Sequence, residues 1–224
     1  ANPVREVQTL DLVVSAHGPG STWLTKQPVG SVIDVVSPLG KPFALPLDPV
    51  PCLLIAGGYG SAPMTFLAEE LSSRGCDVDV IYGASTEAKL FGVLEAKRIA
   101  RHFQITTDDG SAGVKGRVSD VIPQMIAKSD TAVVYACGPM QMLRAVAEAS
   151  EQHGIVSQVA VEESMACGIG VCMTCVLPIV GEDGVTRMTR ACTEGPVFRG
   201  NKVRWDSLDS VPADCLGAPT AGGH

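Results

Sequence analysis

Four cysteines constrain this chain more than any other feature. Cys167, Cys172 and Cys175 lie within nine residues, and Cys192 follows after sixteen more. This C-x4-C-x2-C…C spacing is that of a plant-type [2Fe–2S] site, in which four thiolates hold two irons. Structural zinc usually takes two short cysteine knuckles, so the arrangement of three plus one favours iron–sulfur over zinc.

A β-hairpin gives a geometric reason for the distant fourth cysteine. Apolar runs flank the turn sequence Gly-Glu-Asp-Gly at residues 181–184, which is a hairpin signal. A four-residue loop would pair Val180 with Val185 and would place Cys192 opposite Met173. The hairpin therefore predicts that Cys192 returns to the other three cysteines, as a four-ligand site requires.

Composition excludes several classes of protein. The 224 residues carry a net charge of −7, and non-specific nucleic-acid binding needs a basic surface. No apolar run approaches eighteen residues, so we expect no membrane span. Residues 1–9 lack the apolar core of a signal peptide. We therefore predict a reducing, cytoplasmic location, in which thiols bind metal and do not form disulfides.

The first fifty residues have the pattern of short strands and turns. Strands are expected at Leu10–Ser15 and Val32–Val36, with turns at His17–Thr22 and Ser37–Gly40. This is a fragment of an antiparallel sheet with too few strands to close a barrel. We therefore assign residues 1–50 to a partial antiparallel barrel.

Residues 51–161 alternate strand and helix patterns, which predicts a parallel sheet covered by helices on both faces. The expected strands are at 52–56, 78–82, 104–107, 131–136 and 155–161, and the expected helices are at 61–74, 86–102, 118–128 and 140–153. Residues 162–206 form the cysteine module, and residues 207–224 have the composition of a disordered tail. The predicted fold class is thus mixed α/β with an additional β part.

Two glycine turns of the α/β region are candidates for nucleotide binding. Gly57, Gly58 and Gly60 join a buried strand to a helix, where backbone N–H groups can meet a phosphate. Cys137 and Gly138 end another strand, at the sheet edge where such folds bind ligands. The alternatives are a tight strand–helix turn and a buried structural thiol.

The carboxylates and histidines give weaker evidence for a functional site. Asp108 and Asp109 follow a strand and could hydrogen-bond ribose hydroxyls, although a solvated turn is the favoured interpretation. The histidines are dispersed without metal spacing or a Ser–His–Asp arrangement, and no catalytic acid or base is predicted.

Taken together and in this order, the motifs resemble the ferredoxin–NAD(P) reductase superfamily. Within it, the chain is similar to the electron-transfer subunit of the NAD-dependent, B-type dihydroorotate dehydrogenases. The segments that carry the resemblance, which runs from about Leu10 to Trp205, are residues 37–40, 107–116, 136–140 and 162–175.

The resemblance implies three cofactors and their contacts. The cluster ligands would be Cys167, Cys172, Cys175 and Cys192. NAD would meet a loop and a turn, formed by Gly57, Gly58 and Gly60 and by Cys137 and Gly138. The strand-end position of Asp109, and not the resemblance, makes it the candidate for the ribose. FAD would meet a strand and a phosphate turn, formed by Val13, Val14 and Ser15 and by Gly20, Ser21 and Thr22.

The chain departs from the family pattern at the flavin end. The family's Arg-Pro-x-Ser motif is absent, Ser15 stands where a basic residue is usual, and Ala56 replaces the first of three glycines. These departures leave three interpretations open: a barrel whose first half is missing, a loosely held flavin, or no flavin.

The resemblance also implies a function, in pyrimidine biosynthesis. An FMN-containing dihydroorotate dehydrogenase catalytic subunit, joined in a heterotetramer of two plus two, would supply electrons. These would pass through the cluster and FAD to NAD+, with no complete activity in this subunit alone. The alternatives are an NAD(P)H–ferredoxin reductase-type subunit and a non-enzymatic, zinc-stabilised interaction module. The choice of NAD over NADP stays open.

Overall fold

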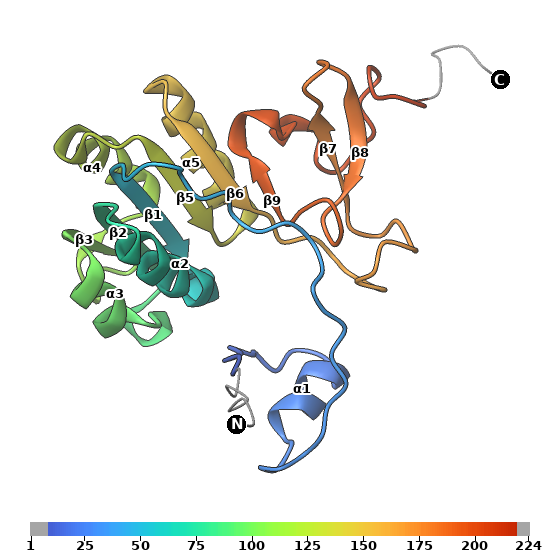
Figure 1. Ribbon diagram of the computed structural model, residues 1–224, viewed down its shortest axis with the longest axis horizontal. Coiled ribbons are helices and arrows are strands. Elements are labelled where there is room, and N and C mark those ends of the chain that lie inside the picture. The colour runs from blue at the N-terminus through green and yellow to red at the C-terminus, as the bar shows by residue number, and fades with distance from the viewer. Residues whose placement is uncertain (1–8, 219–224) are drawn as a thin grey trace, which may run out of the picture. The chain divides into compact units, whose positions relative to one another are not determined.

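The computed structural model describes residues 9–218. It consists of two compact units, of which the first ends at Ser37 and the second begins at Pro38. Figure 1 labels the helices and strands of both. No helix among residues 9–218 combines the length and the apolar character that crossing a membrane would need.

The first unit contains one short helix, α1 (Pro19–Thr25), where the sequence pattern predicts a turn. Pro19 occupies the first turn, where a missing N–H costs nothing. The hydroxyl of Ser21 accepts hydrogen bonds from the N–H groups of His17 (3.0 Å) and Gly18 (3.1 Å), which fixes the start of the helix. A local hydrogen-bonding pattern therefore favours a helix over an open turn.

The predicted barrel fragment is wrong for the described residues of this unit. Leu10–Ser15 and Val32–Val36 are not strands, and neither segment joins a ladder in residues 9–218. A strand is stabilised by a neighbour that pairs with its backbone groups. Leu10 and Val32 are 78% and 94% exposed, so apolar alternation alone did not produce a sheet.

The second unit is built on a seven-stranded sheet in the order β4-β3-β2-β1-β5-β6-β9. All neighbours pair in parallel except β6 with β9. The strands are β1 (Cys52–Gly57), β2 (Val78–Ala84), β3 (His102–Thr107), β4 (Val114–Lys115), β5 (Val133–Cys137), β6 (Val156–Ala160) and β9 (Val197–Arg199). The predicted parallel α/β sheet is therefore confirmed.

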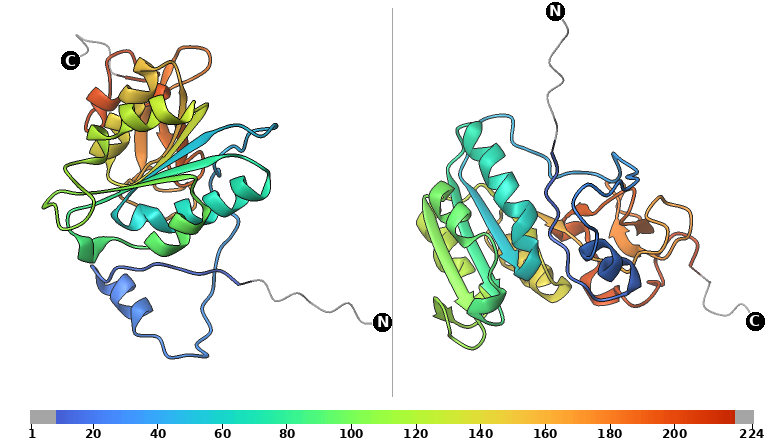
Figure 2. Two further views of the ribbon diagram at one scale, coloured as in Figure 1. Left: turned by 90° about the vertical axis from the view of Figure 1, so that its left-hand side faces the viewer. Right: turned by 90° about the horizontal axis from the view of Figure 1, so that it is seen from below.

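Helices cover both faces of this sheet (Figures 1 and 2). One core packs β1 and β2 against α2 (Ser61–Ser73) and α3 (Val93–Ile99). The other packs the opposite face against α4 (Ile122–Ser129) and α5 (Met140–Gln152). Because every residue of β1 is buried, its continuous apolar sequence follows from contact on both faces.

The helix predicted over residues 86–102 is divided. A 3-10 turn at Glu87–Lys89 is followed by a break, and α3 begins only at Val93. Gly92 precedes it with φ +68°, a left-handed conformation that glycine adopts without a steric penalty. His102 already belongs to β3, which begins two residues earlier than predicted.

Residues 38–50 belong to the second unit and not to a barrel. The backbone N–H of Lys41 donates to the carbonyl of Gly195, and the ring of Phe43 packs edge-on against Tyr135 at 5.6 Å. The Tyr135 hydroxyl donates to the carbonyl of Ala44 at 3.0 Å. The predicted domain boundary at residue 50 is therefore wrong, because these contacts tie the preceding segment to the sheet.

The cysteine module contains the predicted hairpin, formed by β7 (Val176–Val180) and β8 (Thr186–Arg190). Its register is shifted by one residue, since Val180 pairs with Thr186 and the loop occupies residues 181–185. Continued past the strand ends, this register would place Cys192 opposite Thr174 and not Met173. The fourth cysteine still returns to the short cysteine segment.

Residues 207–218 pack against this hairpin, so the prediction of a disordered tail is wrong there. The N–H of Leu216 donates to the carbonyl of Thr186 at 2.8 Å. Arg204 and Asp214 form an ion pair at 2.8 Å, and Cys215 is buried. The rest of the predicted tail, residues 219–224, lies outside the described residues.

A buried carboxylate anchors the amino ends of β2 and β3. Asp79 is fully buried and accepts hydrogen bonds from the guanidinium of Arg101 (2.7 Å) and from the N–H (3.0 Å) and Nδ1 (2.8 Å) of His102. Burial opposes ionisation, but the bonds from Arg101 and His102 outweigh it and hold the pKa of Asp79 below its usual value. The charged form is therefore stabilised by folding.

Replacing this carboxylate should destabilise the fold. We expect Asp79→Asn to lower the free energy of unfolding by roughly 3 kcal/mol near pH 7, because it leaves Arg101 without its buried partner. Glu70→Gln, which removes an exposed helical pair with Arg74, is the control and should cost about 0.5 kcal/mol or less.

Urea unfolding at several pH values tests the physical cause. Since folding lowers the pKa of Asp79, its contribution is complete above the unfolded pKa of about 3.9 and is lost as pH falls through the folded pKa. The difference in the free energy of unfolding between wild type and Asp79→Asn should therefore become smaller below about pH 4. A difference that stays constant below pH 4 would contradict the role of the ionised Asp79 carboxylate.

Candidate nucleotide cleft and cysteine loop

The four predicted cluster ligands are all free thiols and lie as two pairs. The side chain of Cys167 interacts with that of Cys172, and the side chain of Cys175 with that of Cys192. As arranged, no group of three or more His, Cys, Asp or Glu side chains in residues 9–218 converges closely enough to hold a metal ion. The four thiols thus lie in the same module, where Cys167 is next to Cys172 and Cys175 is next to Cys192.

The loop around Cys167 favours its thiolate. The backbone N–H groups of Cys172, Ile169 and Val171 lower the pKa of Cys167 to about 6. The amide nitrogens of Val171 and Cys172 lie 3.3 and 3.4 Å from its sulfur. The hydroxyl of Thr174 donates to the sulfur of Cys172 at 3.1 Å and lowers the pKa of that thiol as well.

The loop and the hairpin contact one another through Gly170. A Cβ at this position would lie 2.8 Å from the Thr193 side chain, and φ of Gly170 is +86°, so only glycine fits there. The guanidinium of Arg190 donates to the carbonyl of Gly170 at 2.7 Å and also pairs with Glu194. These contacts hold the loop with the first three cysteines against the segment that carries the fourth.

Cys175 and Cys192 form the buried pair. The Cys175 side chain, followed by burial, raises the pKa of Cys192, while the N–H of Gly170 opposes this. The hydroxyl of Thr193 is buried near Cys192, lowers the pKa of that thiol by its proximity, and has no hydrogen-bond partner at bonding distance among residues 9–218. Four reduced thiols surrounded by N–H and O–H donors fit the chemistry of an iron–sulfur cluster.

The structure brings the two predicted glycine turns together. Ala56 of β1 lies beside Cys137 of β5 in the parallel ladder. A Cβ on Gly60 would lie 2.1 Å from the carbonyl oxygen of Cys137, and a Cβ on Gly138 would lie 2.9 Å from the amide nitrogen of Gly57. The backbones of the two turns thus touch, which explains why glycine is needed in both.

Cys137 is not a reactive nucleophile. Burial, followed by the nearby carboxylate of Glu162, raises the pKa of Cys137 to about 11. The side chain is therefore a neutral thiol at physiological pH.

A cavity of about 450 Å³ opens beside these turns, at the carboxyl ends of β1, β2 and β3. Of the residues predicted to meet the nucleotide, Gly57 and Gly58 line it, and Gly60, Cys137 and Gly138 do not. Sequence reasoning missed several other lining residues, namely Ser85, Lys89, Thr106, Arg117, Gln141 and Met142. The sequence feature that most of these residues share is their place in the chain, at the end of a parallel strand or in the segment that follows one.

The predicted role of Asp109 is not supported by its surroundings. Its carboxylate is exposed and accepts hydrogen bonds from the N–H (3.0 Å) and hydroxyl (2.6 Å) of Ser111, which lower its pKa. The cavity is lined by Asp108 instead. The favoured alternative, a solvated turn, describes Asp109 better, and a ribose contact by this residue stays a prediction.

The residues expected at FAD do not form a site in the first unit. Ser15 interacts with the ring of His17 at 3.0 Å, and the hydroxyl of Ser21 is occupied in capping α1. The neighbouring Gly20 and Thr22 belong to this helix, and Val13 and Val14 pair with no strand among residues 9–218. Contacts between these residues and FAD therefore stay a prediction, and we assign them no step in the reaction.

Two family models match the chain. The first describes the iron–sulfur cluster binding domain of dihydroorotate dehydrogenase B and matches residues 162–204. The second describes an oxidoreductase NAD-binding domain and matches residues 54–148. The matches coincide with the cysteine module and with most of the parallel sheet.

Solved structures show the same fold. The chain aligns over 89% of its length, and 68% of the other chain, with a structure described as an NADH-dependent reduced ferredoxin-NADP oxidoreductase that carries out flavin-based electron bifurcation. The TM-score is 0.72 and the identity 30%. The cytochrome b5 reductase domain of Ulva prolifera nitrate reductase matches at a TM-score of 0.50 and 23% identity, over 62% of this chain and 61% of that one.

Two relatives cover most of the chain. A protein of Geobacillus thermodenitrificans is 39% identical over 86% of this chain and 73% of its own length. A protein of Desulforamulus reducens is 34% identical over 88% of this chain and 75% of its own. Both are named electron transfer subunits of dihydroorotate dehydrogenase B (NAD(+)), and this chain belongs to the same family.

Proposed function

We propose that the chain carries electrons from an FMN-containing dihydroorotate dehydrogenase subunit, through a [2Fe–2S] cluster and FAD, to NAD+. One observation supports this most directly. Ala160, the last residue of β6, pairs with Cys137 of the nucleotide turn, and Glu162, the first residue of the cysteine module, follows two residues later. The module therefore begins beside the nucleotide cleft, which favours a short path between the two ends.

The cluster end and the nucleotide end of the proposed electron path have separate chemical tasks. An iron–sulfur cluster exchanges single electrons, and a flavin converts these to the hydride that a nicotinamide accepts. Cys167, Cys172, Cys175 and Cys192 would hold the cluster, and the family model for an iron–sulfur domain supports that assignment. The flavin is supported by the similarity to the ferredoxin-NADP oxidoreductase, whose electron bifurcation is described as flavin-based.

The chain's own contribution is to position the nucleotide and to surround it with apolar surface. Gly57, Gly58 and Gly60 bring backbone donors to the nucleotide phosphates at the start of α2, where the helix dipole also favours an anion. Pro139 and Met142, which lie against Gly57, line the cavity with apolar surface. The matches at residues 54–148 and 162–204 support separate nucleotide and cluster domains at about 51–161 and 162–206.

An apolar rim on the cysteine loop supports a protein partner. Met165, Ile169, Val171 and Met173 are 54%, 51%, 75% and 50% exposed, and all lie within this loop. Exposed apolar patches of this kind mark interaction surfaces. We propose that the catalytic subunit docks there, in a heterotetramer of two plus two, with its donor near the cluster.

Co-purification tests the assignment of the partner. The chain, expressed with a tagged FMN-binding dihydroorotate dehydrogenase subunit, should co-elute at equal stoichiometry and reduce NAD+ with dihydroorotate. Stable association with ferredoxin-linked turnover instead would favour the alternative suggested by the ferredoxin-NADP neighbour. A colourless protein that contains zinc would favour the interaction module.

Removing one cluster ligand tests the conduit. We expect Cys172→Ser to lose most of the visible iron–sulfur absorbance and about a hundredfold or more of dihydroorotate-dependent NAD+ reduction, because even the loss of a group that only supports a ligand commonly costs about 10- to 100-fold. Cys215→Ser, at a buried thiol outside the loop, is the control and should keep both properties. Full NAD+ reduction by Cys172→Ser would overturn the conduit.

The hydroxyl of Thr193 should tune the cluster potential. Donors near the sulfurs stabilise the reduced, more negative state, so Thr193→Val should lower the potential by about 40 mV if one bond of about 1 kcal/mol is removed. Thr193→Ser should restore it. A redox titration followed by EPR measures the shift, and Thr189→Val, whose hydroxyl donates to the carbonyl of Arg187, is the control. Equal potentials in Thr193→Val and wild type would contradict this role.

A further inference from the structure

Cys192 lies in a short turn, residues 190–194, that is closed by the residues two positions before and after it. The N–H of Glu194 donates to the carbonyl of Arg190 at 3.0 Å, and the carboxylate of Glu194 accepts from the N–H of Arg190 at 2.9 Å. The guanidinium of Arg190 donates to the same carboxylate, through Nη2 at 3.2 Å and Nε at 3.3 Å. Main-chain and side-chain bonds between one pair of residues therefore fix the backbone around the fourth cysteine.

Arg190 also reaches the loop that carries the first cysteines. Its remaining guanidinium nitrogen, Nη1, donates to the carbonyl of Gly170 at 2.7 Å, and Gly170 lies between Cys167 and Cys172 in the sequence. One side chain thus bonds to the loop through one nitrogen and to the Cys192 turn through the other two. Arginine suits this task because its planar fork presents donors in fixed directions, whereas lysine offers a single ammonium group.

The hairpin places the backbone of Arg190 next to the buried pair of cysteines. Arg190 pairs with Val176 at the end of the β7–β8 ladder, and Val176 directly follows Cys175. The next residue, Ala191, donates its N–H to the carbonyl of Cys175 at 2.9 Å. The Arg190 backbone therefore adjoins both Cys175 and Cys192, while its guanidinium lies against the loop that carries the other two thiols.

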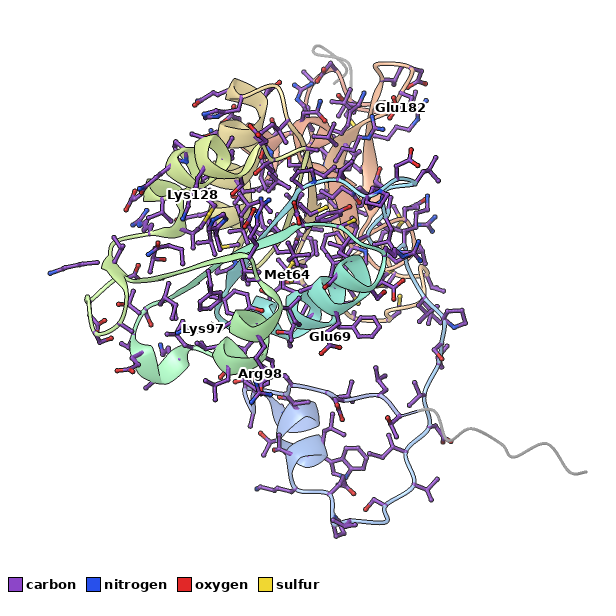
Figure 3. All side chains as sticks on the ribbon, turned by 60° about the vertical axis from the view of Figure 1, so that its left-hand side comes forward. Met64, Glu69, Lys97, Arg98, Lys128 and Glu182 are labelled. Carbon is purple, nitrogen blue, oxygen red and sulfur yellow. The ribbon has the colours of Figure 1, made fainter. Side chains whose placement is uncertain are left out.

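A second ion pair on the same strand lacks these contacts. Arg187 and Asp183 are also four residues apart and form two bonds, at 2.7 and 2.9 Å. The side chain of Arg187 is 43% exposed and that of Arg190 is 34% exposed, so the two pairs are similar in burial. The Arg187 pair lies at the turn end of the hairpin, where Figure 3 labels Glu182. The bond to Gly170 is therefore what distinguishes Arg190.

We propose that Arg190 is a positioning residue for the iron–sulfur cluster. It holds the loop with Cys167 and Cys172 against the turn with Cys192. The inference rests on the proposed function, which assigns the four cysteines to the cluster, and adds a residue that is not itself a ligand. Groups that orient metal ligands commonly affect metal affinity by about 10- to 100-fold.

The rate of iron loss to a chelator measures this role on the full chain with its cluster. Arg190→Gln should lose iron about tenfold or more faster than wild type, because the bonds of the guanidinium to the loop and to the turn are removed together. Arg190→Lys keeps the charge but not the fork of donors, so its rate should lie between those of wild type and Arg190→Gln. Arg187→Gln is the matched control and should lose iron as slowly as wild type.

The midpoint potential separates this role from general damage to the fold. The net charge around a cluster is one of the factors that set its potential. In a redox titration followed by EPR, Arg190→Gln should have a lower potential than wild type, because the lost cation favours the reduced, more negative cluster. Arg190→Lys should restore the potential. Glu194→Gln removes the opposite charge from the same turn and should raise it, whereas a merely loosened fold would not shift the two potentials in opposite directions.

Each outcome has a defined meaning. Faster iron loss from Arg190→Gln, with opposite potential shifts in Arg190→Gln and Glu194→Gln, supports the inference. Iron loss no faster than that of Arg187→Gln, or potentials that do not move apart, overturns it and leaves the proposed function standing. If Arg190→Gln does not fold, Arg190→Lys decides, and iron loss at the wild-type rate then overturns the inference. If wild type binds no iron, the proposed function fails and the inference with it.

Discussion

The parallel ladder between β1 and β5 positions the turns, the cavity and the start of the cysteine module in the second unit. It places Ala56 beside Cys137, so the turns that follow the two strands meet at one edge of the sheet. Their backbones approach so closely that a Cβ on Gly60 would overlap the Cys137 carbonyl. The cavity, its cations and the beginning of the cysteine module all lie at the carboxyl ends of strands fixed by this ladder, as expected for open α/β sheets.

The same constraint explains what could be predicted from sequence. A buried parallel strand needs an apolar run, and a strand–helix turn at a close approach needs glycine, so β1 and its turn were recognisable residue by residue. Lys89 and Arg117 carry no such local signature. Their shared cavity depends on how β2, β3 and α5 are arranged in space, which no short segment specifies.

The sequence-based predictions were wrong in two situations. In one, a strand-like segment has no strand to pair with, and in the other, the hairpin closes with a longer loop than the one assumed. Alternation at Leu10–Ser15 indicates a strand only if a neighbour pairs with it, and none does among the described residues. The hairpin register shifted by one residue because Gly181 bonds to Val185 across the turn. That five-residue loop is as compatible with the sequence as a four-residue one.

The two ends of the proposed conduit are built by different means, and this follows from their chemistry. Single electrons need only proximity and a suitable potential, so the cluster end depends on thiols and on donors such as Thr174 and the backbone of the loop. A nucleotide must be recognised by shape and charge, and the other end offers glycine turns and a cavity lined by charged side chains of both signs. Cys137, in the turn at the nucleotide end, has a pKa raised by burial and is a neutral thiol at physiological pH.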